Sequence, residues 1–300
     1  MPMKKLLVLS IVLGTFAFST TLLAQIGYYA EQGETSEGLP AFSVDLPVLE
    51  GTKSLSEFYD YDNAVYASSD TGLEVAELSQ FFLYRDTDDG SLGLVIIHDK
   101  PSDPNGGAVT FTIGPKTEEE TGLPDTATLA VSDDPGEFTV SAPSAKGVWG
   151  WATCCTDGGA IGGLEDTEFS FWIDVSRPFS GITKWAARVG MGSDELVELP
   201  SLSEPVKIVA APDGDGDGIV DERDNCPSDE NTNQSDLDQD GAGDVCDCAP
   251  EDPNQSNFCA PCAAQMTGGV SFGSFLLLPT LLLPLLLRRS RSEEGSARRR

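Results

Sequence analysis

An acidic segment that repeats with a period of 23 residues constrains this chain more than any other feature of its sequence. When Asp213 is aligned with Asp236, acids stand at positions 1, 3, 5, 9 and 12 of both copies and glycine stands at position 6 of both. Alternate acids can turn their carboxylates toward one point, and glycine permits the sharp reversal that follows. Hard oxygen ligands in a flexible shell favour Ca²⁺ over Mg²⁺. The repeat therefore predicts a duplicated calcium-binding loop.

The segment 213–247 resembles the thrombospondin type 3 repeat. It contains an Asn-Cys-Pro element at 225–227, an Asn-x-x-Gln element at 231–234 and a Gly-x-Gly-Asp-x-Cys-Asp element at 241–247. The resemblance implies a compact segment, almost free of helix and strand, that wraps around calcium ions. It also implies two ligand sets, the first being Asp213, Asp215, Asp217, Asp221 and Asp224 and the second Asp236, Asp238, Asp240, Asp244 and Asp247.

The charge of the whole chain agrees with a cation-binding protein. It carries 49 Asp and Glu against 18 Lys and Arg, a formal charge of -31. This charge excludes nucleic-acid binding through a basic surface, and it suits solubility and an extracellular location.

The N-terminal residues predict export. Lys4 and Lys5 precede an apolar run at 6–18, and the small residue Ala24 ends a plausible cleavage region. We interpret 1–24 as a secretory signal peptide, with a membrane anchor as the alternative. Export places the seven cysteines in an oxidising environment, where disulfides persist.

The C-terminal residues carry a second targeting pattern. An apolar stretch at 270–287 is followed by a cluster of arginines, and a linker at 258–269 contains Cys259 and Cys262. This order resembles the myxobacterial-type C-terminal sorting signal, which implies a removable hydrophobic helix and basic tail at 270–300. A single-pass anchor is the alternative. Both readings hold the protein near a membrane.

The residues between the signal peptide and the repeat have the composition of an all-β domain. Short β-branched or aromatic runs alternate with turn residues, and no long helical stripe appears. We predict an antiparallel β-sandwich or jelly roll over 25–211, followed by the calcium-binding segment at 212–257. The predicted strands are 80–84, 92–98, 108–114, 126–131, 138–141, 148–153, 169–175, 182–189 and 206–210.

Few other residues of this domain are candidates for ligand binding or catalysis. Trp149 and Trp151 should share one face of a strand, either as a platform for a sugar ring or as core. His98 is the only histidine and is expected to end a strand rather than act as a base. The run 157–159 is expected to be a turn that could hold a ligand, although turn chemistry alone explains its composition. Because no catalytic constellation is present, we predict that the protein is not an enzyme.

The cysteines leave several pairings open. Cys226 and Cys246 flank the loops and are candidates to pair, but Cys246 and Cys248 could also pair further along the chain. Cys154 and Cys155 could form a vicinal bridge. Seven thiols cannot all pair within one chain, and the Cys259/Cys262 pair, nearest the apolar tail, is the expected source of the unpaired thiol. We expect Cys262 to be the processing or lipid-attachment residue, which leaves Cys259 as a further disulfide candidate.

These features predict a secreted calcium-binding protein of the cell surface, with a role in adhesion or envelope structure. Its partners would be calcium, the membrane through the tail, and an extracellular glycan or surface protein. A carbohydrate-binding module is the alternative, favoured if both tryptophan rings are exposed on a flat face. A secreted hydrolase is a less favoured alternative, and it requires a cleft with a carboxylate pair beside a tryptophan or His98.

Overall fold

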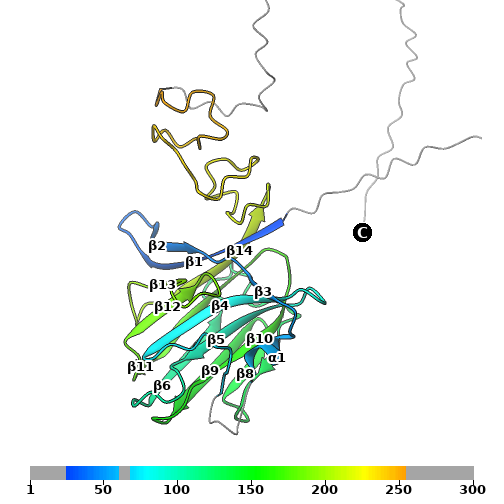
Figure 1. The fold of residues 1–300 in the computed structure, drawn as a ribbon, viewed down its shortest axis with the longest axis vertical. Coiled ribbons are helices and arrows are strands. Elements are labelled where there is room, and N and C mark those ends of the chain that lie inside the picture. Colours follow the sequence, from blue (N-terminus) through cyan, green and yellow to red (C-terminus); the bar gives the residue numbers. More distant parts are fainter. Residues whose placement is uncertain (1–24, 61–67, 255–300) are drawn as a thin grey trace, which may run out of the picture. The chain divides into compact units, whose positions relative to one another are not determined.

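A computed structural model describes residues 25–60 and 68–254 of the chain. The predicted signal peptide, the sorting tail and the cysteines at 259 and 262 lie outside these residues. The described part is nearly all β and contains two sheets with antiparallel strands in the majority (Figure 1). The predicted all-β class is confirmed.

The first sheet is antiparallel throughout and contains both ends of the domain. Strand β1 pairs with β14, so the first and last strands lie side by side. The order across the sheet is β2 (Pro40–Asp45), β1 (Gln25–Glu34), β14 (Val206–Asp213), β11 (Phe169–Ser180), β6 (Gly107–Gly114), β9 (Ser144–Trp151) and β8 (Phe138–Ser141).

The second sheet is built around two central strands. Strand β4 has one antiparallel neighbour, β5, and pairs in parallel with both β12 and β3. The order is β13 (Leu196–Glu198), β12 (Lys184–Arg188), β4 (Leu78–Asp86), β5 (Leu92–His98), β10 (Asp157–Leu164) and β7 (Thr128–Val131), with β3 (Leu49–Gly51) beside β4.

The main core lies between the two sheets. It takes Phe111 and Phe171 from the first sheet and Phe81 and Ile96 from the second, all buried. Alternate residues of the central strands form a second core on the outer face of the second sheet, around Tyr84. Because β5 is buried on both faces, its sequence is a continuous apolar run over 92–97 rather than an alternating one.

A short helix covers this second core. Helix α1 (Leu55–Tyr59) starts at Ser54, where the Ser54 hydroxyl and the Glu57 carboxylate form a capping box. Phe58 of the helix stacks on Tyr84, with ring centroids 4.0 Å apart. The cap fixes where the helix begins, and the stacked rings hold it against the sheet.

Each of the nine predicted strands overlaps an observed one, but the turn predicted at 157–159 is wrong. These residues begin β10, where Asp157 pairs with His98 of β5. A Cβ on Gly158 would overlap the carbonyl oxygen of Ile96, and one on Gly159 would lie 2.5 Å from Phe138. The glycines are therefore required by close packing inside the sandwich, although they look like turn residues in the sequence. The sequence also gave no prediction of β1, β2, β3 or β13.

His98 occupies the strand end that was predicted for it. It is the last residue of β5 and is fully buried, with Nδ1 2.9 Å from the Ser79 hydroxyl oxygen. Its ring stacks on Trp151, with centroids 5.5 Å apart. Burial lowers its pKa to about 3, which indicates a neutral imidazole in the core.

Between about pH 3 and the ordinary histidine pKa of about 6.5, the unfolded chain binds a proton at His98 that the folded chain does not. The histidine's contribution to stability is therefore present above pH 6.5 and is lost as the pH falls. In chelator, the unfolding free energy of the unmodified protein should fall about 1.4 kcal/mol per pH unit more steeply than that of His98→Gln in this window. Denaturant titrations at several pH values measure both slopes, and equal slopes would contradict a neutral buried imidazole.

Candidate metal centre

Two groups of three aspartates converge in the acidic repeat. The carboxylates of Asp213, Asp215 and Asp217 approach within 4.8 Å of one another, and so do those of Asp236, Asp238 and Asp240. The first group starts on the sandwich, because Asp213 is the last residue of β14 and pairs with Gln25. The predicted boundary at 211 therefore falls inside β14, which continues directly into the first loop (Figure 1).

The two loops repeat each other hydrogen bond by hydrogen bond. In the first, the position 1 carboxylate accepts from the N–H groups of positions 4 and 6, at 2.7 and 2.9 Å. In the second, the same distances are 2.8 and 3.0 Å. The carboxylates at positions 3 and 5 each accept from the N–H group two residues further on in both copies. The pattern of hydrogen bonds between backbone N–H groups and carboxylates thus repeats with the same 23-residue period as the sequence.

The glycine at position 6 is required by the turn itself. Gly218 and Gly241 both have φ of +96°, in the region that L side chains rarely adopt. A Cβ would meet nothing within 4 Å at either residue. The requirement is therefore conformational and does not come from crowding.

Several carboxylate oxygens in the loops are buried without a hydrogen-bond donor. Each of these acids has its Oδ1 held by a backbone N–H group, and its Oδ2 has no partner. Five oxygens of this kind are Oδ2 of Asp215, Asp224, Asp238, Asp240 and Asp247. Burial raises the pKa of Asp215 and of Asp238, and their neighbouring aspartates raise it further. Unpartnered buried carboxylate oxygens are rare, and a bound cation would satisfy them.

The acids at positions 9 and 12 have different surroundings. Asp224 and Asp247, at position 12, interact electrostatically with the position 3 aspartates of their loops. Asp221 and Asp244, at position 9, instead accept the N–H group of position 2, at 2.6 and 2.9 Å. Neither position 9 acid belongs to the converging groups of three. The structure thus gives these two residues a loop-closing contact.

The Asn-Cys-Pro and Asn-x-x-Gln elements join the two loops. The backbone N–H of Asn231 donates to Asp217 Oδ2 at 2.8 Å, and the Asn231 side chain donates to Asn225 Oδ1 at 2.7 Å. The Gln234 side chain donates to Asp224 Oδ1 at 2.7 Å. These amides hold two acids of the first loop. The link to the second loop comes from Asn225, whose carbonyl oxygen accepts the N–H group of Gly243 at 3.0 Å.

The structure shows how some of the cysteines are paired. Cys226 pairs with Cys246 across the two loops, and Cys154 pairs with its neighbour Cys155. Cys248 is also disulfide-bonded. The first two pairings were among the predicted ones, whereas Cys259 and Cys262 lie outside the described residues.

The first loop packs on the sandwich. Val220 is buried against Gly27 of β1, where a Cβ would lie 2.9 Å from the valine side chain. The Arg223 guanidinium lies over the Tyr29 ring, 4.6 Å from its centroid, and forms an ion pair with Asp45. In contrast, the hydrogen bonds made by 236–247 stay within 225–249. Only the first loop is therefore held directly by the sheets.

The tryptophan platform considered for glycan binding is not present. Trp149 and Trp151 do share one face of β9, as predicted, but this face is the inner one, and the residues are only 2% and 6% exposed. Their indole N–H groups donate to the Gly158 carbonyl at 2.7 Å and to Asp99 Oδ2 at 2.9 Å. Both rings belong to the core and cannot stack on a sugar.

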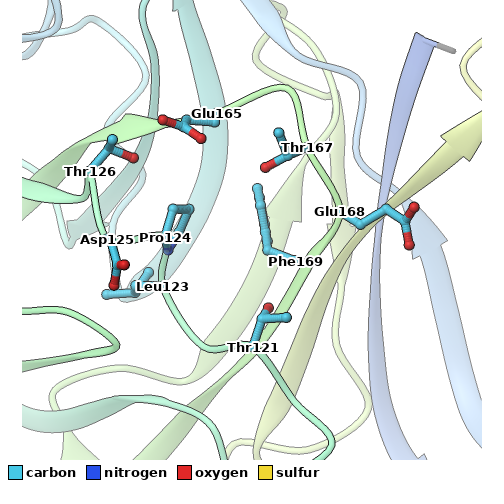
Figure 2. Close-up of a pocket in the computed structure, with 9 residues that line it drawn as sticks. All are labelled: Thr121, Leu123, Pro124, Asp125, Thr126, Glu165, Thr167, Glu168 and Phe169. Atoms are coloured by element: carbon cyan, nitrogen blue, oxygen red, sulfur yellow. The ribbon is translucent and has the colours of Figure 1, made fainter. Parts of the chain in front are cut away.

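A surface pocket of about 380 Å³ lies beside β11. Its lining includes three acids, Asp125, Glu165 and Glu168, together with threonines and Phe169. Figure 2 shows the Glu168 carboxylate directed away from the hollow that the other labelled side chains surround. No tryptophan lines this pocket and neither does His98, so it does not match the cleft required for a hydrolase.

Comparison of the chain with protein-family models, with curated proteins and with solved structures finds no match. Within residues 25–60 and 68–254, no helix has the length and apolar composition needed to cross a membrane.

The difference in packing between the loops gives a prediction with a matched control. If the loops bind calcium, the bound ion should stabilise the sandwich by about 2.7 kcal/mol at calcium concentrations near 100 times the dissociation constant. The equivalent substitutions Asp215→Asn and Asp238→Asn each remove one unpartnered oxygen. We expect Asp215→Asn to abolish most of this stabilisation and Asp238→Asn to preserve it, in thermal unfolding followed by the fluorescence of the buried tryptophans. Equal losses would contradict the one-sided packing.

Proposed function

We propose that this protein is a secreted, surface-displayed calcium-binding protein whose two acidic loops each hold a Ca²⁺ ion. The observation that carries the proposal is the set of five buried, unpartnered carboxylate oxygens, distributed over two loops with equivalent hydrogen bonds. Positions 1, 3, 5 and 12 would supply carboxylate ligands, and backbone oxygens would complete each shell.

The donor chemistry favours calcium over other common metals. The converging side chains are all carboxylates, and the described loops contain no histidine; their cysteines 226 and 246 are paired with each other. Oxygen donors suit Mg²⁺ and Ca²⁺, and an irregular loop that supplies many ligands suits the larger ion. Affinities of about 10⁻⁴–10⁻³ M are typical of extracellular calcium modules.

Calcium binding should be coupled to the order of the segment. Residues 213–257 contain 15 acids and a single arginine. From 214 to 254 the backbone runs in turns and bends, with neither helix nor extended strand to hold it. Without a cation, repulsion among the carboxylates opposes this compact arrangement, so metal binding supplies the free energy that orders it.

Limited proteolysis tests this coupling. In chelator, cleavage sites should become accessible within 213–247 while the sandwich stays intact, and added calcium should restore protection. Magnesium at the same concentration is the control for ionic strength and should protect less. Digestion at the same rate with chelator and with calcium would overturn the proposal that calcium orders the loops.

The biological role proposed is adhesion or envelope structure. Its support is indirect: the sequence carries export and sorting patterns at its two ends, the buried tryptophans provide no sugar platform, and the surface pocket at β11 does not match a hydrolytic cleft. A calcium-ordered segment between a sandwich and a membrane-directed tail would act as a short spacer. A stiff spacer keeps the domain clear of the cell surface.

The proposed surface display has a separate test. If the tail is a sorting signal, the mature surface protein should begin near Gln25 and end at Cys262, which would carry a modification. Intact mass spectrometry of protein released from cells measures both ends. A chain that still extends to Arg300, with an unmodified Cys262, would indicate an ordinary anchor instead.

A further inference from the structure

A third group of converging acids lies outside the calcium loops, in the sandwich itself. Asp133, Glu137 and Asp157 bring carboxylate oxygens within 4.8 Å of one another. Asp133 and Glu137 lie in the connection between β7 and β8, and Asp157 is the first residue of β10. The three residues therefore come from two distant parts of the sequence.

Hydrogen bonds from neighbouring groups fix two of these acids in place. Asp157 is 3% exposed, and its two oxygens accept the N–H groups of Gly158 and Gly150, each at 2.7 Å. Asp133 accepts the Ser68 hydroxyl at 2.6 Å and the N–H of Asp134 at 3.0 Å. Each of these oxygens retains acceptor capacity for another partner, since a carboxylate has about four lone-pair sites.

One further polar atom beside the cluster has no hydrogen-bond partner. The hydroxyl of Tyr59 is buried without a hydrogen bond on a residue only 1% exposed. Within the cluster, Glu137 Oε2 is buried without an N–H or O–H donor, and the Glu137 carboxyl group interacts with those of Asp133 and Asp157. Burial raises the pKa of the Tyr59 hydroxyl, and the charges of Asp157, Asp133 and Glu137 raise it further, which places the hydroxyl near the cluster. A buried hydroxyl without a partner is costly, and it points to an occupant that the protein alone does not supply.

No basic side chain compensates the cluster. None of the ion pairs formed by residues 25–60 and 68–254 includes Asp133, Glu137 or Asp157. Burial raises the pKa of Glu137, and the carboxylates of Asp133 and Asp157 raise it further. Burial and the charge of Asp133 also raise the pKa of Asp157, whereas the hydrogen bonds that it accepts from Gly158 and Gly150 and its hydrogen bond with Glu137 lower it. Three ionised carboxylates this close together require a positive charge between them.

We propose that Asp133, Glu137 and Asp157 form a third cation site, selective for a hard divalent ion such as Ca²⁺, with the Tyr59 hydroxyl as a neutral oxygen donor. This site is independent of the two acidic loops and lies within the β-sandwich. An ion there would join the β7–β8 connection to the start of β10 and to helix α1. The competing occupant is a proton shared among the carboxylates.

Calcium counting in the full chain separates these occupants. The starting protein is a variant whose loop sites are removed by Asp215→Asn, Asp217→Asn, Asp238→Asn and Asp240→Asn. Equilibrium dialysis with ⁴⁵Ca²⁺ should show one ion still bound per chain. Adding Glu137→Gln should remove that ion, whereas adding Asp125→Asn, which removes an acid from the pocket at β11, should not.

A stability measurement keeps the test decisive if binding is weak. Calcium should raise the unfolding temperature of the four-fold variant, and Glu137→Gln should abolish this rise. Asp133→Asn serves the same purpose if Glu137→Gln does not fold. The proposal is overturned if the four-fold variant binds no calcium, if binding survives both substitutions, or if each substitution changes the unfolding temperature equally with and without calcium, as a shared proton requires.

Discussion

Repulsion between carboxylates held close together is the constraint on which the arrangement of the acidic segment depends. Among residues 25–60 and 68–254, three groups of acids bring their oxygens within 4.8 Å, and six buried carboxylate oxygens lack a donor, five in the loops and one at Glu137. At 4 Å, two unit charges repel by about 1 kcal/mol in water and about 4 kcal/mol near a protein surface. Several such pairs rival the net stability of a domain, which is about 5–15 kcal/mol. In the proposed function, a cation that converts this repulsion into attraction decides whether the segment is ordered.

The sandwich provides the fixed frame for the first of these sites. Strand β14 lies between β1 and β11 and ends at Asp213, so the first aspartate of the first loop is placed by sheet hydrogen bonds. Val220 and Arg223 then hold the end of the same loop against β1 and β2. The second loop is attached through the Cys226–Cys246 disulfide and through the N–H group of Gly243, which donates to the Asn225 carbonyl oxygen at 3.0 Å. The sheets thus hold the first loop in place, and the first loop holds the second.

The parts of the molecule that could be predicted from sequence are those with a local signal. Apolar runs such as that of β5 identified nine strands, and the 23-residue period identified the loops, because each depends on residues near one another in the chain. Strand β10 was missed because its glycines, needed for close packing against Ile96 and Phe138, have the composition of a turn. The cluster around Asp157 was missed for a second reason. Its acids come together only when β10 lies beside β7, and no local pattern encodes that pairing.

Anomalous diffraction from crystals grown with calcium tests the central claim most directly. The account predicts one calcium peak beside Asp213, Asp215 and Asp217 and another beside Asp236, Asp238 and Asp240. The unpartnered oxygens of positions 3 and 12 should lie about 2.3–2.6 Å from these ions. Loops that keep the same hydrogen bonds in saturating calcium but carry no anomalous peak would contradict the account.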